Sequence, residues 1–491
     1  MSRRIFGTES EYAPMVQRTG RAVGTKETAG TILEQQEQIS VRLMAGAAAL
    51  GVPMAGEFLG NGGRLYVDRG GHPEYATPEC DSVNDLVAHE LAGDRMVQEL
   101  AECVQLPGGS VRLHVFKNNV DLYGHTYGGH ENYLVTPRGM DAISRLIPFL
   151  VTRQIYAGAG KVMTRARDGD FGFQLSQRAD FFDRTYSDRT SEVRGIINVR
   201  KREISRGDQG QRLHLIIGDS NMAQHTVGLK IGTLVLVLQL LESGALDDDF
   251  ELLSPSDALK SVSRDLHAGI TCRLRGRCRD HSALEIQSIF LEKALRYYSG
   301  NTPGQEEAYW LHTWEETLCN LKEVKVRLAD MALERDGGDL RRRIDWILKL
   351  WILDRSRSKG ADPEQLKTLD LKYHDLNPAS GTYLRCLELD LVDRLISDSA
   401  IAAARYHPPR NTRAYLRGQV VQEAFQKNVV AEVENWERIR VRARSDGPDS
   451  QHCFNRVRHE RNSLRISLED PFRSEDAHVM KALREFIEKW G

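Results

Sequence analysis

NGGRLYVDRGGHPEYATPECD, residues 61–81, joins two strand-like stretches through a Gly-Gly turn and carries a dense set of acidic side chains. Positions 64, 66 and 68 share one face of a strand, so Arg64, Tyr66 and Asp68 are expected in a row. Glu74 follows the glycine turn and is expected beside them. The stretch therefore predicts a rigid ribbon that brings a basic group, a cation ligand and a possible general base together.

The N-terminus carries a matching piece, RRIFGTESEY at residues 3–12, in which Glu9 and Glu11 point to the same face of a strand. If this strand and the ribbon pair, up to four carboxylates converge. Their repulsion requires cations, and oxygen-only ligands suit Mg²⁺ better than zinc. The pattern indicates a magnesium site that holds nucleotide phosphates. Spacing alone leaves open two edge strands with solvated acids.

Length and composition limit the number of domains, the kinds of partner and the cellular compartment that are expected for this protein. A chain of 491 residues with 41% hydrophobic residues predicts one large domain and a smaller one. Its 67 basic and 69 acidic residues nearly cancel, which argues against nucleic acid or membrane as a partner. The most apolar run, residues 231–241, is too short to cross a bilayer. Seven scattered cysteines without a CxxC pair fit reduced thiols, so a soluble, cytoplasmic protein is expected.

The hydrophobic periodicity predicts an α+β fold. Strands are expected at residues 3–12, 61–68, 111–118, 130–135, 195–199 and 212–217, and helices at 31–49, 82–103 and 143–154. The region from about 283 to 353 reads as helical, and its four tryptophans are expected to be packing anchors. His-Pro-Pro-Arg at 407–410 predicts a boundary between a large domain, 1–409, and a small C-terminal domain, 410–491.

Three arginines stand at expected strand ends, namely Arg178, Arg200 and Arg212. Their planar, permanently charged forks match phosphate or carboxylate oxygens. Surface salt bridges remain the alternative. The turn at 219–221 precedes a helix that it would cap.

The glycine-rich stretch FKNNVDLYGHTYGGHENYL, residues 116–134, crowds polar side chains at a turn. It is either a loop that shapes a ligand site or an ordinary hairpin in which glycines adopt positive φ. His130 and Glu131 do not form a zinc motif, because no third ligand stands at helical spacing.

Residues 437–444, ERIRVRAR, place four arginines on one face of a strand. Further arginines stand at 456, 458, 461 and 465. Such a stripe suits an acidic protein partner or nucleic acid. It equally suits an edge strand that charge protects against aggregation.

Ten motifs in one order carry a resemblance to a known family. They are GTESEY, NGGRLYVD, HPEYATPECD, FKNNVD, YGGHENYL, FLVTRQ, FQLSQR, RLHLIIGDSN, TRAYLRG and DPFR. The run resembles the enzymes of prokaryotic ubiquitin-like protein (Pup) modification, which are the Pup ligase and its sister, the depupylase and deamidase. Both are relatives of glutamine synthetase. The resemblance covers residues 3 to about 475.

The resemblance implies a glutamine synthetase-like fold, with a curved antiparallel sheet cradle backed by helices and a small C-terminal domain. It also implies site residues, and each is carried over at its matching position. Asp68 is the implied catalytic base. The implied Mg²⁺ ligands are Glu9, Tyr66 and Glu74, and the implied ATP contacts are Arg64, Thr77 and Trp436. Arg178 and Arg212 are expected as further phosphate contacts on the chemistry of their guanidinium groups, apart from the resemblance.

The implied activity is ATP-dependent ligation of a Pup-like modifier, through its C-terminal glutamate, to lysines of target proteins. The short separation between the two acidic strands, residues 13–60, resembles the ligase, as do AGAGKV, GDSNM and KYHDL. FKNNVD and GFQLSQR resemble the depupylase, so hydrolysis of the isopeptide bond is the alternative. A non-catalytic scaffold that binds the modifier is the second alternative. The sequence departs from both branches at 201–207, KREISRG.

Overall fold

The structure is a computed structural model of the 491-residue chain. It describes residues 3–18, 29–104, 111–121, 124–164, 171–188, 193–199, 210–246, 251–275, 279–327, 331–427, 429–442 and 463–490. The chain divides into two compact units. Unit 1 comprises residues 1–7, 37–105 and 397–491, and unit 2 comprises 8–36 and 106–396. This division does not test the predicted boundary at 409/410, which stays a prediction.

Unit 2 is built on a sheet whose strands follow the order β11-β12-β13-β8-β1. β13 pairs with β8 and β12 in antiparallel fashion, and β11 pairs with β12 in parallel, so the sheet is mixed at this edge. Its strands are β1 (Phe6–Glu11), β8 (Gly129–Val135), β11 (Arg184–Ser187), β12 (Gly195–Asn198) and β13 (Gln211–Leu215). The strands predicted at 130–135, 195–199 and 212–217 are confirmed, as is the α+β class.

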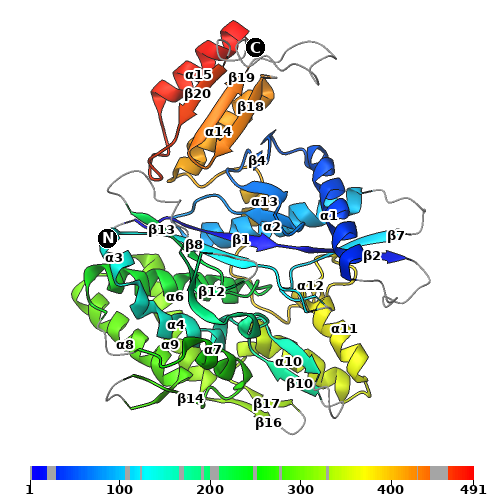
Figure 1. The fold of residues 1–491 in the computed structure, drawn as a ribbon, viewed down its shortest axis with the longest axis vertical. Coiled ribbons are helices and arrows are strands. Elements are labelled where there is room, and N and C mark those ends of the chain that lie inside the picture. Colours follow the sequence, from blue (N-terminus) through cyan, green and yellow to red (C-terminus); the bar gives the residue numbers. More distant parts are fainter. Residues whose placement is uncertain are drawn as a thin grey trace. The chain divides into compact units, whose positions relative to one another are not determined.

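Helices α4 (Ile147–Thr152), α6 (Gln224–Ser243), α8 (Ala283–Gly300) and α9 (Gln305–Leu321) pack together in unit 2. Figure 1 shows them gathered below β8 and β13. The expectation that tryptophans anchor this region is confirmed for Trp310, Trp314 and Trp346, which are at most 2% exposed. The fourth, Trp351, is partly exposed and lies under the guanidinium groups of Arg341 and Arg355.

Among the described residues, one helix is long and apolar enough to cross a membrane by length and composition. It is α6, with a mean hydropathy of 1.4 and 78% of its apolar window buried inside the protein. The apolar run noticed in the sequence is the middle of this longer helix. Gly228 and Gly232 lie against the indole of Trp310, where a Cβ would come within 2.3 and 2.6 Å of ring atoms. The glycines thus let α6 and α9 approach closely.

Unit 1 contains strands β3 (Met54–Ala55), β4 (Phe58–Leu59), β5 (Arg64–Val67) and β6 (Pro73–Ala76), which pair in this order. Helix α2 (Val83–Cys103) packs on β6. Ser82 begins the helix as its N-cap and accepts a hydrogen bond from the amide of Asp85. Gly93 makes the packing possible, since a Cβ there would lie 2.1 Å from Cδ1 of Tyr75.

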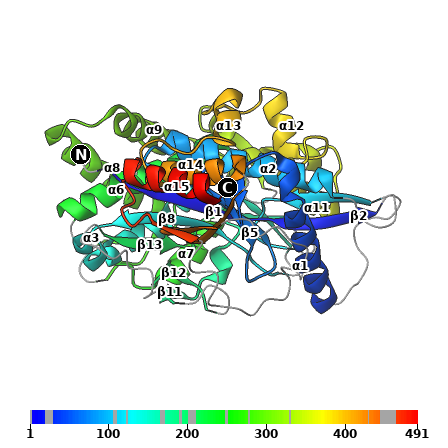
Figure 2. The ribbon, with the colours of Figure 1, turned by 90° about the horizontal axis from the view of Figure 1, so that it is seen from above.

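The C-terminal residues of unit 1 form a small sheet with two helices. The strands β18 (Val430–Asn435), β19 (Arg438–Arg442) and β20 (Ser463–Ser467) pair in this order. Helices α14 (Arg413–Gln426) and α15 (Ala477–Trp490) cover one face and share an apolar core with the sheet. Figure 2 shows the two helices side by side. The break predicted at 407–410 lies between α13 (Asp398–Ala404) and α14.

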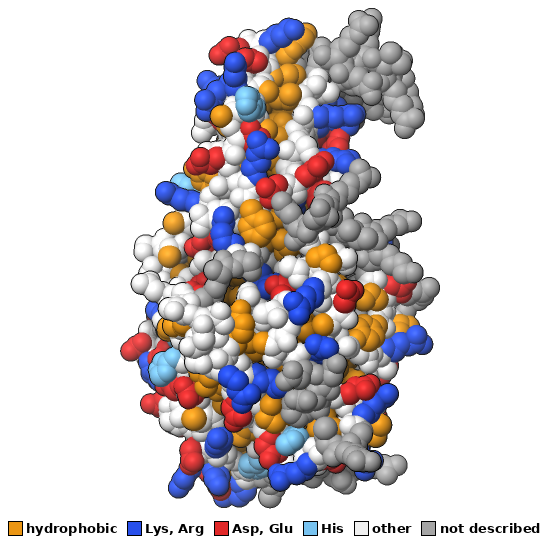
Figure 3. Space-filling model, turned by 90° about the vertical axis from the view of Figure 1, so that its left-hand side faces the viewer, with side chains coloured by type: hydrophobic (Ala, Val, Ile, Leu, Met, Phe, Trp, Pro, Cys, Tyr) orange, Lys and Arg blue, Asp and Glu red, His pale blue; other side chains and the backbone are white. Residues whose placement is uncertain are grey.

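Among the described residues, four two-stranded sheets also belong to unit 2. β14 (Thr271–Cys272) pairs with β15 (His281–Ser282), and β16 (Val324–Arg327) pairs with β17 (Ala332–Asp336). β2 (Ala13–Arg18) pairs with β7 (Val111–Phe116), and β9 (Lys161–Thr164) pairs with β10 (Phe171–Gln174). Helices α1 (Ala29–Ala45), α5 (Gln154–Ala157), α7 (Pro255–Arg264), α10 (Asp345–Arg357), α11 (Pro363–Tyr373) and α12 (Thr382–Glu388) complete the main elements. Figure 3 shows basic and acidic side chains interspersed over one face of the protein.

Candidate active site

The β5–β6 hairpin in unit 1 carries most of the predicted site. Tyr66 lies directly opposite Glu74 in the antiparallel pair, and Arg64 lies opposite Ala76. Residues that face each other across a ladder project to the same side. The expectation that Arg64, Tyr66 and Glu74 share one face of a ribbon is therefore confirmed.

Asp68 is fixed by the tight turn that follows β5. Its Oδ1 accepts a hydrogen bond of 2.6 Å from the amide of His72, and Nδ1 of the same histidine lies 3.5 Å away. Gly71 adopts φ +80°, and a Cβ at Gly70 would lie 2.9 Å from Oδ2 of Asp68. The Gly-Gly pair thus gives the turn its shape and leaves room for the carboxylate.

The electrostatics of this turn keep Asp68 ionised. Burial acts to raise its pKa, but the hydrogen bond and charge of His72 overcome that effect and lower the pKa below the usual value. The carboxylate is 17% exposed, so it remains open to a second partner. Asp68 can therefore accept a proton or a hydrogen bond at neutral pH.

Arg64 and Thr77 occupy the same hairpin and the residue after it. The guanidinium carbon of Arg64 lies 4.0 Å from the centre of the Tyr66 ring, and Nε donates to Glu57 at 2.9 Å. Thr77 is 4% exposed. A Cβ at Gly7 would lie 3.1 Å from Oγ1 of Thr77. The absence of a side chain at Gly7 therefore leaves room for the Thr77 hydroxyl.

Trp436 lies in the turn between β18 and β19, within the same unit as the hairpin. Its ring meets Phe58 edge to face at 5.0 Å. The guanidinium of Arg417 lies 4.9 Å from the centre of the indole. The aromatic ring is partly exposed, so it retains a free surface.

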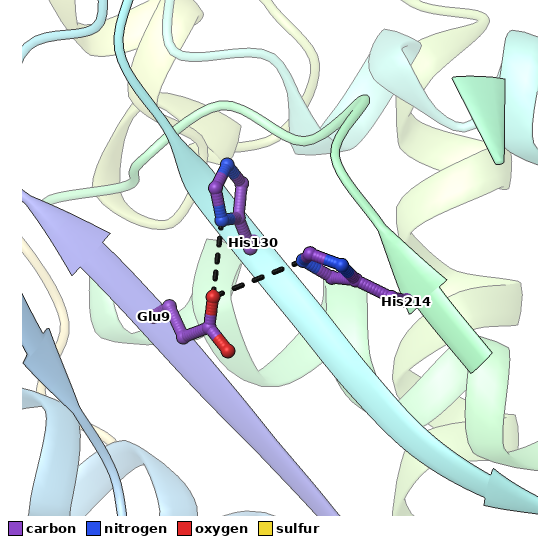
Figure 4. A group of neighbouring side chains, drawn as sticks. All are labelled: Glu9, His130 and His214. Carbon is purple, nitrogen blue, oxygen red and sulfur yellow. Dashed lines mark hydrogen bonds and ion pairs between the residues drawn. The ribbon is translucent and has the colours of Figure 1, made fainter. Parts of the chain in front are cut away.

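Glu9 lies in unit 2 on β1, beside two histidines from neighbouring strands. Its Oε2 is 3.1 Å from Nδ1 of His130 on β8 and 3.8 Å from Nε2 of His214 on β13. Figure 4 shows both rings beside the carboxylate. Oε1 accepts from Arg212 at 2.8 Å and from Asn132 at 3.0 Å. Burial acts to raise the pKa of Glu9, but the histidines and Arg212 hold it well below the usual value.

One ligand atom from each of Glu9, His130 and His214 lies within 4.8 Å of the others, so the three side chains form a candidate metal-binding group. The sequence offered no third ligand for His130 at helical spacing. The third group comes instead from a different strand, His214 in RLHLII, which only the sheet order brings near. The sequence offers one signal for His214 as a site residue: it lies two positions after Arg212, so both side chains point to the same face of the strand.

Glu11 points to the same face as Glu9, as predicted. Its Oε1 is 3.9 Å from Nε2 of His130, and its Oε2 accepts from the amide of Gly128 at 2.5 Å. His130 is therefore flanked by both carboxylates.

Arg178 and Arg212 differ in their surroundings. Arg212 is 28% exposed and bridges Glu9 and Asn132. Arg178 is 2% exposed and donates to the backbone carbonyl of Ile216 and to Oγ1 of Thr126. Burial lowers the pKa of Arg178 to about 10. A phosphate contact stays a prediction for both.

Asp219 has a different role from the predicted helix cap. The N-cap of α6 is Ala223, without a side-chain cap. Asp219 instead accepts hydrogen bonds from the amides of Ala159 and Gln177 at 2.9 Å and from the hydroxyl of Ser176 at 2.9 Å. The buried carboxylate thus ties FQLSQR to AGAGKV.

The arginine strand is not an edge strand. β19 pairs with β18 on one side and β20 on the other, so protection of an edge does not explain its arginines. Arg440 is paired with Glu434 and Arg442 with Glu432, while Arg440 lies opposite Arg465. Arg444, and the residues at 456, 458 and 461, lie outside the described residues, as do Arg200 and 201–207.

The predicted residues thus form two groups. Unit 1 brings together the hairpin and its turn, Arg64, Tyr66, Asp68, Glu74 and Thr77, and holds Trp436. Unit 2 brings Glu9 together with Arg212, His130 and His214 and holds Arg178. The expected meeting of Glu9 with the ribbon stays a prediction. Arg417, in TRAYLRG, is a contact of Trp436 that sequence reasoning did not single out.

Comparisons with known proteins agree with the resemblance. The profile of the Pup-ligase protein family matches residues 4–440. A Pup–protein ligase of Acidimicrobium ferrooxidans is 35% identical over 98% of this chain and 99% of its own length. That of Saccharomonospora viridis is 37% identical over 86% of this chain and 90% of its own length.

Two solved structures are similar in fold and in sequence. The ligase PafA in complex with Pup matches with a TM-score of 0.83 and 29% identity, covering all of this chain and 93% of the other. PafA in complex with ADP matches with a TM-score of 0.75 and 29% identity, covering 96% and 98%. With a family profile spanning most of its length and relatives above 30% identity, this chain belongs to the Pup-ligase protein family.

Proposed function

We propose that this chain is an ATP-dependent ligase that joins the C-terminal glutamate of a small Pup-like protein to lysine side chains of target proteins. The observation that carries the proposal is the β5–β6 hairpin, in which Tyr66 lies opposite Glu74 and Asp68 occupies the following turn. Family membership supports the reading, because relatives that align with 98% of the chain are named Pup–protein ligases.

The proposed reaction has two steps. An oxygen of the modifier's γ-carboxylate attacks the γ-phosphorus of ATP, the bond to ADP breaks, and an acyl phosphate forms. A lysine amine then attacks the acyl carbon, an isopeptide bond forms, and inorganic phosphate leaves. A carboxylate is a poor electrophile and its acyl phosphate is a good one, which explains the use of ATP.

Asp68 is the proposed base of the second step. A lysine side chain is mostly protonated near pH 7, so its ammonium must lose one proton before attack, and the attacking amine loses a second proton as the C–N bond forms. The amine becomes strongly acidic as its bond to the acyl carbon forms, so a carboxylate is basic enough to take the proton. The lowered pKa keeps Asp68 ionised and ready.

The proposed magnesium ligands are Glu9, Tyr66 and Glu74, which the family motifs imply. Glu9 and Glu74 fit the ion because both offer carboxylate oxygens in shielded surroundings, with Glu74 4% exposed and Glu9 held ionised. When bound, Mg²⁺ would supply positive charge that offsets repulsion between two anions. His130 and His214 orient the Glu9 carboxylate in unit 2.

The proposed nucleotide contacts are Arg64 and Thr77 of the hairpin region and Trp436 of the C-terminal sheet. Their support is that all three belong to unit 1 and that Arg64 and Trp436 both approach the ring of Phe58. Arg178 and Arg212 are proposed as further phosphate contacts. Arg212 has the stronger support, because it is the more exposed of the two.

The test is a reconstitution. The protein is incubated with a modifier ending in glutamate, ATP, Mg²⁺ and a lysine-bearing target. We expect a covalent adduct and ADP in comparable amounts. An adduct without ADP, or neither product, contradicts the ligase assignment.

Hydrolysis of the isopeptide bond is the second candidate, and FKNNVD and GFQLSQR favour it. Cleavage of a preformed conjugate without net ATP turnover would establish it. Neither reaction, together with tight binding of the modifier, would point to the scaffold alternative.

We infer a cytoplasmic location. Five described cysteines, Cys80, Cys103, Cys272, Cys319 and Cys386, are free thiols, which fits a reducing compartment.

A further inference from the structure

Arg417 is a fully buried cation in the second turn of α14, with no exposed surface. Its guanidinium donates to both oxygens of Glu79, one of them at 3.2 Å. It donates to the backbone carbonyl of Gly62 at 2.7 Å and to that of Trp436 at 3.1 Å. One side chain therefore bonds the loop before β5, the segment between β6 and α2 and the turn that carries the tryptophan.

The same guanidinium also packs against aromatic rings. Its carbon lies 4.9 Å from the indole centre of Trp436 and 5.4 Å from the ring centre of Phe58. The two rings meet edge to face at 5.0 Å with an interplanar angle of 80°. Arg417 thus restrains Trp436 through its backbone carbonyl and through its ring.

Glu79 completes the arrangement. It accepts from Arg413 at 2.8 Å as well as from Arg417, so two arginines of one helix hold it. Arg413 also donates to the carbonyl of Leu468 at 3.0 Å and lies 3.6 Å from Glu437. Burial alone would raise the pKa of Glu79, but the two arginines lower it to about 2, and the pair stays charged.

A buried ion pair is weak evidence for a purely stabilising role, because apolar groups of similar volume often stabilise a fold as well or better. Here the guanidinium group makes hydrogen bonds that an apolar side chain could not make. It satisfies two carbonyls and a carboxylate and lies over an aromatic ring that remains partly exposed. This combination fixes the orientation of a ring that still has a free surface.

We propose that Arg417 is a positioning residue for nucleotide binding, which holds the indole of Trp436 in the orientation that receives the base. Glu79 in turn holds Arg417. The proposal rests on the proposed function, in that Trp436 is taken to contact the nucleotide. Arg417 would then influence the affinity for the nucleotide without contacting the reacting carboxylate or amine.

The test is a double-mutant cycle of Arg417→Lys and Trp436→Phe, with ADP affinity measured by calorimetry. We expect Arg417→Lys to raise the Kd for ADP by about tenfold, which corresponds to losing one ring-packed guanidinium contact. The double variant should bind ADP no more weakly than the weaker single variant, since both changes disrupt one contact. The KM for ATP should rise, whereas kcat at saturating ATP and the KM for the modifier should change less than about twofold.

Arg153→Lys is the matched control. Arg153 forms a comparable buried fork with Glu131, at 2.5 and 3.0 Å, in unit 2. This variant should lose stability to a similar extent but leave the Kd for ADP within twofold of wild type. If Arg417→Lys does not fold, Glu79→Gln replaces it, because it loosens Arg417 and keeps its volume, and a severalfold rise in Kd is expected.

The proposal is overturned if Arg417→Lys leaves ADP affinity unchanged, if its effect adds to that of Trp436→Phe, or if Arg153→Lys raises the Kd equally. These outcomes are separate from failure of the proposed function. A wild-type protein that binds ADP but forms no conjugate refutes the ligase, while the cycle still decides the role of Arg417. A wild-type protein that does not bind ADP overturns both.

Discussion

The backbone amide of His72 donates a 2.6 Å hydrogen bond to Oδ1 of Asp68, which holds the carboxylate in the turn between β5 and β6. An equivalent turn occurs in unit 2, where the amide of His125 donates to Oδ1 of Asp121 at 2.8 Å. In both turns, Nδ1 of the histidine also faces the carboxylate. The two turns are alike in their contacts, but only the first belongs to the hairpin that carries the proposed site.

Asp68→Asn tests the proposed base. The amide oxygen of asparagine can still accept the hydrogen bond from His72, so we expect folding and ATP binding to be nearly unchanged. It cannot take a proton from the attacking amine, so conjugate formation should fall by roughly 10² or more. The measurement is single-turnover conjugation at saturating ATP and modifier.

Asp121→Asn is the control for that experiment, since it makes the same chemical change in the same kind of turn. Conjugation by this variant should stay within about threefold of wild type. Unchanged activity of Asp68→Asn would falsify its assignment as the base, and an equal loss in both variants would point to turn geometry instead.

Glu9→Gln tests the magnesium ligand. The substitution removes a negative charge that the structure keeps ionised beside His130, His214 and Arg212. We expect the Mg²⁺ concentration for half-maximal activity to rise by about tenfold or more. Glu242→Gln, which alters a carboxylate that accepts from the amide of Thr136, should leave the titration unchanged. Identical Mg²⁺ curves for wild type and Glu9→Gln would exclude Glu9 as a ligand.

Gly228→Ala tests the packing of α6 on α9. The added Cβ would lie 2.3 Å from Cη2 of Trp310 and 2.9 Å from Cδ2 of Leu395. We expect the free energy of unfolding to fall by about 1–3 kcal/mol, seen as a lower urea midpoint. Gly300→Ala, where nothing lies within 4 Å of the new Cβ, should change it by less than about 0.5 kcal/mol. Equal midpoints for both variants would refute the close approach.

Acid sensitivity should follow from buried His89 on α2. Burial lowers its pKa to about 3, so the folded protein keeps the ring neutral while the unfolded chain takes up a proton below about pH 6.5. The folded pKa is depressed, and therefore stability falls as pH drops from 6.5 towards 3, by up to about 1.4 kcal/mol per pH unit.

His89→Gln removes this titration. Its free energy of unfolding should approach or exceed that of wild type as pH falls below 6.5, while the difference between the two stays constant above pH 7. Parallel curves between pH 7 and pH 4 would show that His89 is not buried and neutral. Urea unfolding at a series of pH values makes the measurement.

Much of the local structure was predictable because it depends on short-range rules. The alternation in RLYVD and the glycines at 70 and 71 predicted the β5–β6 hairpin, and Ser82 marked the start of α2. The shared face of Glu9 and Glu11 follows from strand periodicity alone. These features were accessible from sequence because each depends on residues only a few positions apart.

Contacts across strands and between distant segments were not predictable in this way. The sheet order places His214 beside Glu9, although 205 positions separate them, and pairs β19 on both sides, which rules out an edge strand. Asp219 looked like a helix cap and instead joins two loops.

The sequence by itself determined the family, the α+β class and the acidic hairpin, because ordered motifs and periodicity are properties of the chain. Only the tertiary structure decided which buried groups neutralise one another. Arg417 could not be matched to Glu79 and Trp436 from spacing, since a buried charge is tolerated only where folding supplies its partners. Which residues become partners depends on long-range packing, and short-range sequence patterns do not contain that information.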